Sequence, residues 1–174
     1  PTDRRRDVLD SLGRAIVAGE MAPGQSLTLE AIQSQYGVSR TLARDCVHTL
    51  ESVGVVASRR RVGIVVQPRE HWSALAPQLV RWQLQADPHG PKLGALTELR
   101  AAIEPVAAAA AARRATEGQR SRLLALAAAI RAKGAAGNVA SYLDDDIAFH
   151  SLILEASHND AFKALTGVVA EVLS

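Results

Sequence analysis

The chain has 174 residues, of which 48% are hydrophobic and only 3% aromatic, and its formal net charge is +2. This length allows two small domains, or one domain with a substantial core, and the abundance of alanine among the apolar residues favours helices over sheets. The single cysteine excludes an internal disulfide, and the lack of an apolar run of transmembrane length or of a signal peptide at the start predicts a cytoplasmic protein.

Three helices are predicted at the start of the chain, over residues 7–18, 27–36 and 40–52, because apolar residues recur there at spacings of three and four. Gly19 closes the first helix and Gly54 the third. Gly37 supplies the backbone freedom of a tight turn between the second and third helices, and Ser39 is a suitable N-cap. Two helices joined in this way are typical of a helix-turn-helix motif.

The third helix has two chemically different faces. Its apolar face includes Cys46, for which packing and a reactive thiol are the two alternatives. The opposite face carries Arg40, Thr41, Arg44, Asp45 and His48. The planar fork of arginine suits phosphate oxygens and the paired acceptors of guanine, so this face is a candidate DNA-binding surface. The alternative is a solvated helix that happens to carry two arginines.

A basic hairpin follows, with strands predicted at 55–57 and 63–66 and a tip at 58–61 that contains Arg60 and Arg61. Three helices followed by such a hairpin make a winged helix-turn-helix. The tip is either a solvated turn or a contact to phosphates or the minor groove. Basic residues also cluster at 4–6, and their local density matters more for nucleic-acid binding than the small net charge.

The second half of the chain is predicted to be entirely helical. One short helix around Trp82 lies among prolines in a linker, and longer helices are expected over 93–115, 119–132, 139–157 and 161–174. Pro105 should kink the first of these long helices. The last helix has no cap or breaker before Ser174, so we expect the native protein to continue beyond it. The predicted domains are residues 1–68, 69–91 and 92–174.

Asp146 and His150 form a second candidate site on the predicted helix over 139–157. They lie four residues apart among apolar positions on one side of this helix. Buried polar groups must be paired, hydrogen-bonded or bound to a metal, and these two offer one oxygen and one nitrogen ligand. The alternatives are a plain Asp–His hydrogen bond or exposure at a loosely packed edge.

The first part of the sequence resembles the GntR family of bacterial transcription regulators over residues 8–66. The motifs that carry the resemblance are Pro23-Gly24-x-x-Leu27, Gly37-Val38-Ser39-Arg40-Thr41, Arg44, Leu50-Glu51-x-x-Gly54-Val55 and Arg61-x-Gly63. The resemblance implies DNA contacts at Ser39, Arg40, Thr41, Arg44 and Gly63. At Glu30 the sequence departs from the arginine that the family often has, so we expect that family contact to be absent.

The second part resembles the FCD effector domain of the FadR subfamily, through Glu98-Leu99-Arg100-x-x-Ile103-Glu104-Pro105 and Asp146-x-x-Phe149-His150. The resemblance implies that Asp146 and His150 bind a divalent metal (zinc, nickel or manganese) with two later histidines. Those histidines are not in this sequence, so we expect an empty or weakly occupied metal site here. Arg100 matches an arginine of the effector pocket, and its alternative is a salt bridge with Glu104.

Together these features predict a ligand-responsive transcription regulator, a repressor or an activator, of which the repressor is favoured. It would bind an inverted-repeat operator as a homodimer and respond to a small carboxylate, in association with the bacterial nucleoid. The dimer would form through the helices of the second half, with the linker helix around Trp82 as a further contact. The alternative functions are a metal-dependent hydrolase with an accessory winged domain, and a winged helix used only for protein contacts.

Overall fold

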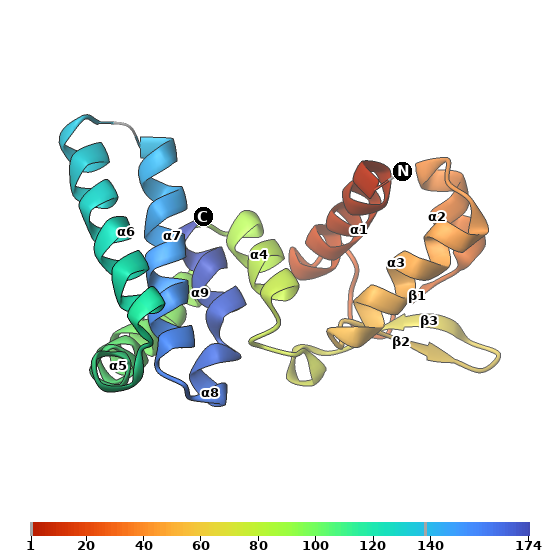
Figure 1. The fold of residues 1–174 in the computed structure, drawn as a ribbon. Coiled ribbons are helices and arrows are strands. Elements are labelled where there is room, and N and C mark those ends of the chain that lie inside the picture. Colours follow the sequence, from red (N-terminus) through yellow and green to blue (C-terminus); the bar gives the residue numbers. More distant parts are fainter. Residues whose placement is uncertain (1, 138) are drawn as a thin grey trace. The chain divides into compact units, whose positions relative to one another are not determined.

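The computed structural model describes residues 2–137 and 139–174, and the chain divides into two compact units, Pro1–Pro88 and His89–Ser174 (Figure 1). The first unit combines four α-helices with a small sheet, and the second contains only helices in its described residues. None of the helices in the described residues is long and apolar enough to cross a membrane.

The elements of the first unit follow the order of a winged helix-turn-helix. They are α1 (Thr2–Val17), β1 (Ser26–Leu27), α2 (Leu29–Tyr36), α3 (Arg40–Ser52), β2 (Val56–Arg59), β3 (Gly63–Val66), the short 3-10 helix η1 (Arg69–His71) and α4 (Pro77–Ala86). The three predicted helices are confirmed, although α1 begins earlier than expected. Its first turns carry charged residues, which give no apolar periodicity.

The wing is a three-stranded antiparallel sheet in the order β1-β3-β2, whereas the sequence predicted a two-stranded hairpin. β1 pairs with β3 through Ser26 opposite Val65 and Leu27 opposite Ile64. A strand of two residues is too short to show the alternation by which strands are recognised. The predicted start of the second helix at Leu27 was therefore wrong, because Leu27 lies in β1 and α2 begins at Leu29.

Local caps set the geometry of the helix-turn-helix. The Thr28 hydroxyl accepts a hydrogen bond from the Ala31 amide at 3.0 Å, and the Ser39 hydroxyl accepts one from the Leu42 amide at 3.2 Å. Gly37 ends α2 in the left-handed conformation, with φ of 61°. These residues start α2 and α3 at defined points, so the turn between the two helices is short and fixed.

One core holds the first unit together. It includes the fully buried side chains of Leu12, Ile16, Ile32, Leu50, Val55 and Trp82. α4 belongs to this core because Trp82 packs against α1. The expected linker helix is therefore present, but it is docked on the winged unit.

The second unit is built around α7 (Val139–Ala156), which contacts α5 (Pro91–Arg114), α6 (Glu117–Ala135), α8 (Asp160–Lys163) and α9 (Thr166–Leu173). Its core is formed by Ala107, Leu154 and Val169. The small alanine side chain lets α5 approach α7 closely. α5 is a single continuous helix through Pro105.

The predicted helix over 161–174 was wrong, because α8 and α9 are separate helices. The Asn159 side chain accepts a hydrogen bond from the Ala161 amide at 3.0 Å and starts α8, which lasts one turn. The Thr166 hydroxyl then donates to the Lys163 carbonyl at 2.8 Å at the junction with α9. Neither residue is a glycine or proline, so the break had no strong signal in the sequence.

Candidate functional site

The exposed face of α3 presents the side chains that the sequence singled out. Arg40, Thr41, Arg44, Asp45 and His48 are exposed, whereas Ala43, Cys46, Val47 and Leu50 are buried. The predicted division of this helix into a polar and an apolar face is confirmed. Because Ser39 caps the helix, the polar face begins at its first turn, where backbone N–H groups also favour anions.

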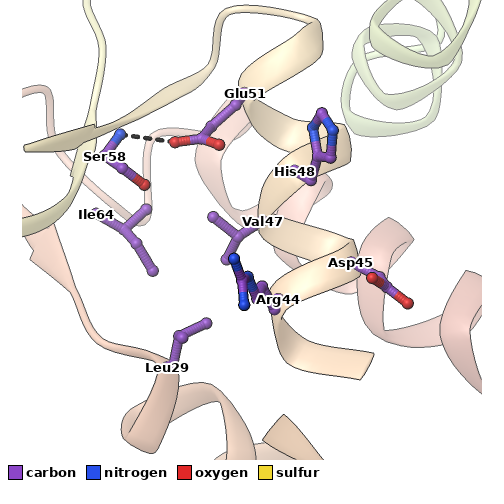
Figure 2. Close-up of a pocket in the computed structure, with 8 residues that line it drawn as sticks. All are labelled: Leu29, Arg44, Asp45, Val47, His48, Glu51, Ser58 and Ile64. Atoms are coloured by element: carbon purple, nitrogen blue, oxygen red, sulfur yellow. Dashed lines mark hydrogen bonds between the residues drawn. The ribbon is translucent and has the colours of Figure 1, made fainter. Parts of the chain in front are cut away.

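A hollow of about 380 Å³ lies between α3 and the wing, and Arg44 projects into it from α3 while Asp45 points away (Figure 2). Leu29 and Ile64 form its apolar walls. At its upper edge the Glu51 carboxylate accepts a hydrogen bond from the Ser58 amide at 2.7 Å. Glu51 thus fixes the wing to the end of α3, a role that the sequence did not reveal because the two groups belong to different elements.

The tip of the wing is basic and exposed, as Arg59, Arg60 and Arg61 all lie in solvent. Arg61 and Gly63 both have positive φ angles, 65° and 102°. A Cβ atom at Gly63 would lie 2.9 Å from the Leu27 carbonyl oxygen. Gly63 therefore permits the close pairing of β1 with β3 and sets the direction of the basic tip.

Glu30 and Arg40 form an ion pair across the helix-turn-helix. The Glu30 Oε1 atom lies 2.8 Å from the Arg40 Nη1 atom, and the two side chains are 65% and 67% exposed. The pKa of Glu30 is lowered, first by the N–H of its own backbone and second by the hydrogen bond from Arg40. The Glu30 carboxylate is thus charged and engages Arg40, a predicted DNA-contacting residue.

Cys46 is a packing residue in this structure. Its side chain is fully buried, and its thiol donates to the Arg5 carbonyl oxygen over 3.7 Å. Burial raises the pKa of this thiol, so the reactive thiolate is disfavoured.

In the second unit, Arg100, Glu104, Asp146 and His150 form a partly buried cluster. The Arg100 Nε atom lies 2.6 Å from Glu104 Oε1, and His150 Nδ1 lies 3.0 Å from Glu104 Oε2. On the other side of the ring, His150 Nε2 lies 3.6 Å from Asp146 Oδ1. The structure therefore joins the three predicted residues in one chain of contacts, in which Glu104 links Arg100 to His150 and Asp146 lies on the other side of His150. The sequence suggested Glu104 only as a partner of Arg100.

Asp146 and His150 alone provide too few donors for a complete metal site. The described residues contain no group of three or more His, Cys, Asp or Glu side chains arranged to hold an ion. Glu104 is engaged by Arg100 and faces Nδ1 of His150. Asp146 lies near Nε2, on the opposite side of the ring. A zinc site usually has three or four protein ligands, so this pair fits only part of one.

The two units match two known protein families. Residues 4–66 match the model of the bacterial regulatory proteins of the gntR family, and residues 95–174 match the FCD domain. The matched ranges contain the helix-turn-helix and wing in the first case and the Arg100–His150 cluster in the second.

Two relatives cover nearly the whole chain. The galactonate operon transcriptional repressor of Escherichia coli (strain K12) is 27% identical over 172 residues, which are 98% of this chain and 73% of the relative. An HTH-type transcriptional regulator of Mycobacterium tuberculosis is 30% identical over 171 residues, 95% of this chain and 67% of that protein.

A solved structure supports the fold. It is described as "Lar controls the expression of the Listeria monocytogenes agr system and mediates virulence", and the match covers 97% of this chain and 69% of that one, with a TM-score of 0.55 at 20% identity. The two domain matches and the relatives then show the family of the chain. The chain belongs to the GntR family of bacterial transcription regulators, with an FCD domain as in the FadR-like subfamily, and is a DNA-binding regulator rather than an enzyme.

Proposed function

We propose that this regulator is a repressor that binds an inverted-repeat operator as a dimer and is modulated by a small carboxylate. The observation that carries the proposal is the joint exposure of Arg44, which points into the hollow between α3 and the wing (Figure 2), and of Arg60 and Arg61 at the tip of the wing. A helix of this kind enters the major groove with its first turns, and a basic wing contacts the flanking backbone.

In this proposal the residues of the interface have different tasks. Arg40 and Arg44 read bases, because a guanidinium can donate two parallel hydrogen bonds to guanine. The neighbouring groups of α3 and the wing contact phosphates or sugars and fix the register: Ser39, Thr41, His48, Arg60, Arg61 and the backbone at Gly63.

The effector site in this proposal is the cluster around Glu104. Arg100 bonds Glu104 through its Nε atom, and its terminal nitrogens bond no other residue in the described part of the chain, so they can receive a carboxylate. Asp146 and His150 would hold a divalent ion only with further donors, such as the effector's own oxygens or water. A bound ion would supply positive charge for the effector and offset the desolvation of Asp146.

Coupling between the two sites follows from linkage. A carboxylate that weakens operator binding must itself bind less tightly to the DNA complex, by the same factor. This requirement distinguishes a regulatory effector from a ligand that merely stabilises the fold.

The test of the DNA interface uses a duplex that the wild-type protein selects from a randomised library, with a scrambled duplex as reference. We expect Arg44→Ala to weaken binding to the selected duplex by about 1–3 kcal/mol and to relax the base preference at one position of each half-site. Arg60→Ala should weaken both duplexes similarly and flatten the salt dependence. Unchanged preference in Arg44→Ala would contradict the assignment of α3.

A further inference from the structure

Glu30 lies in the first turn of α2, and its side chain is 65% exposed. Its carboxylate meets Arg40 of the first turn of α3 at 2.8 Å, although the residues are in different helices. The pair contributes little to stability, because both side chains are about two-thirds exposed and water and salt screen exposed ion pairs. Folding stability therefore does not explain why Glu30 and Arg40 form this contact.

The pair changes what Arg40 can do near DNA. One of its nitrogens, Nη1, is engaged by Glu30, while Nε and Nη2 remain as donors. A single free arginine would bind any phosphate within reach, which adds affinity without sequence preference. A carboxylate beside it repels phosphates and favours guanidinium orientations that keep the contact through Nη1.

We propose that Glu30 is a specificity-determining residue, which holds Arg40 away from the phosphate backbone and orients it toward a base edge. On a matched duplex, the paired acceptors of a guanine offset the repulsion between Glu30 and the DNA. On an unmatched duplex the repulsion is not offset, so non-specific binding is weakened. This inference rests on the proposed DNA-binding role of α3.

The central experiment compares Glu30→Gln with wild type on the selected and scrambled duplexes over a range of salt concentrations. We expect Glu30→Gln to bind the scrambled duplex more tightly and to lower the ratio of the two affinities, by up to about fivefold, as the strength of an exposed pair allows. The slope of log affinity against log salt should steepen by about 0.9, because Arg40 then neutralises one more phosphate.

Two further variants separate the orienting role from simple charge removal. In an Arg40→Ala background, Glu30→Gln should no longer change the affinity ratio, because there is no guanidinium left to orient. Glu70→Gln removes the same charge from an exposed residue outside α2, α3 and the wing and should leave the ratio at the wild-type value. Melting curves followed by circular dichroism check that each variant is folded.

The possible outcomes are distinct. If Glu30→Gln leaves both the ratio and the salt slope unchanged while Arg44→Ala loses sequence preference, the DNA interface stands and the role of Glu30 is refuted. An equal effect of Glu30→Gln with and without Arg40 also refutes orientation of that arginine. If Arg44→Ala has no effect either, the proposed interface itself is wrong.

Discussion

The His150 ring lies between two carboxylates, those of Glu104 and Asp146. It faces Glu104 through Nδ1 and Asp146 through Nε2, at 3.0 Å and 3.6 Å. Nδ1 is buried and is not aligned for a hydrogen bond with any described residue, in spite of the short distance to Glu104. A neutral imidazole has one donor and one acceptor nitrogen, so it cannot donate to both carboxylates. In the neutral ring the acceptor nitrogen faces a carboxylate oxygen, an arrangement that a bound cation or a second proton on the ring would relieve.

Zinc retention tests this argument. After equilibration with excess zinc and desalting, we expect wild-type protein to retain more zinc, by elemental analysis, than His150→Ala does, because the variant lacks the nitrogen ligand. His89→Ala, which removes an exposed histidine at the start of the second unit, serves as the control and should retain as much as wild type. Equal retention in all three proteins would mean that Asp146 and His150 form only an internal polar contact.

The sequence revealed the residues of α3 but not their partners. Arg40, Arg44 and His48 were predictable because a helical period of 3.6 residues places them on one face without any knowledge of the rest of the fold. The contacts of Glu30 with Arg40 and of Glu51 with the Ser58 amide join separate elements, so they depend on tertiary packing. For the same reason Glu104 was expected only as the i+4 neighbour of Arg100, and its contact with His150 was missed.

At the scale of elements, α4 is locked to α1. The Asp10 carboxylate accepts hydrogen bonds from Gln78 Nε2 and from the Trp82 indole N–H, both at 2.8 Å. Trp82 is fully buried, and its ring lies over Gly13. The Trp82 side chain is therefore used inside the winged unit, so the predicted dimer contact of this linker helix would involve its other side chains. A buried indole N–H needs an acceptor, and Asp10 provides it.

Gly13 is the point where this contact between α1 and α4 can be tested. A Cβ atom there would lie 2.3 Å from the Trp82 ring, so Gly13→Ala must displace the indole. We expect the free energy of unfolding to fall by about 1–3 kcal/mol, as is usual for overpacking, despite the higher helix propensity of alanine. Denaturant unfolding followed by circular dichroism measures this change.

Gly94 in α5 is the matched control for that substitution. A Cβ atom at Gly94 would meet no other atom within 4 Å, so Gly94→Ala should raise stability by about 0.5–1 kcal/mol through helix propensity alone. Equal effects of the two substitutions would show that Trp82 does not rest on Gly13.

Elements with a long apolar periodicity were predicted correctly, whereas elements too short to show a full period were missed. α3 and α4 were found within a few residues, since each carries several apolar residues on one face. β1 has two residues and α8 one turn, so neither contains a full repeat of its pattern. Their positions are set by pairing with β3 and by the Asn159 cap, which act through the folded structure.

At the scale of the whole molecule, the second unit leaves large apolar side chains in solvent. Val106, Leu124 and Val139 are 57%, 73% and 67% exposed, and α6, which carries Leu124, contains no buried residue. A contiguous apolar patch marks a surface that associates, and we expect these exposed side chains to contribute to one. An inverted-repeat operator needs two winged helices related by a two-fold axis, which a symmetric dimer through these helices would supply.

Sedimentation tests the dimer and the part that α6 plays in it. We expect wild-type protein at micromolar concentration to sediment as a dimer, and Leu124→Asp to shift it toward monomer because a carboxylate in an apolar contact loses its hydration. Leu75→Asp, at a residue 46% exposed in the first unit, is the matched control and should remain dimeric. If both variants stay dimeric, the dimer forms without Leu124. A wild-type protein that stays monomeric with and without the selected duplex would refute the dimer, and each winged helix would then have to recognise its half-site alone.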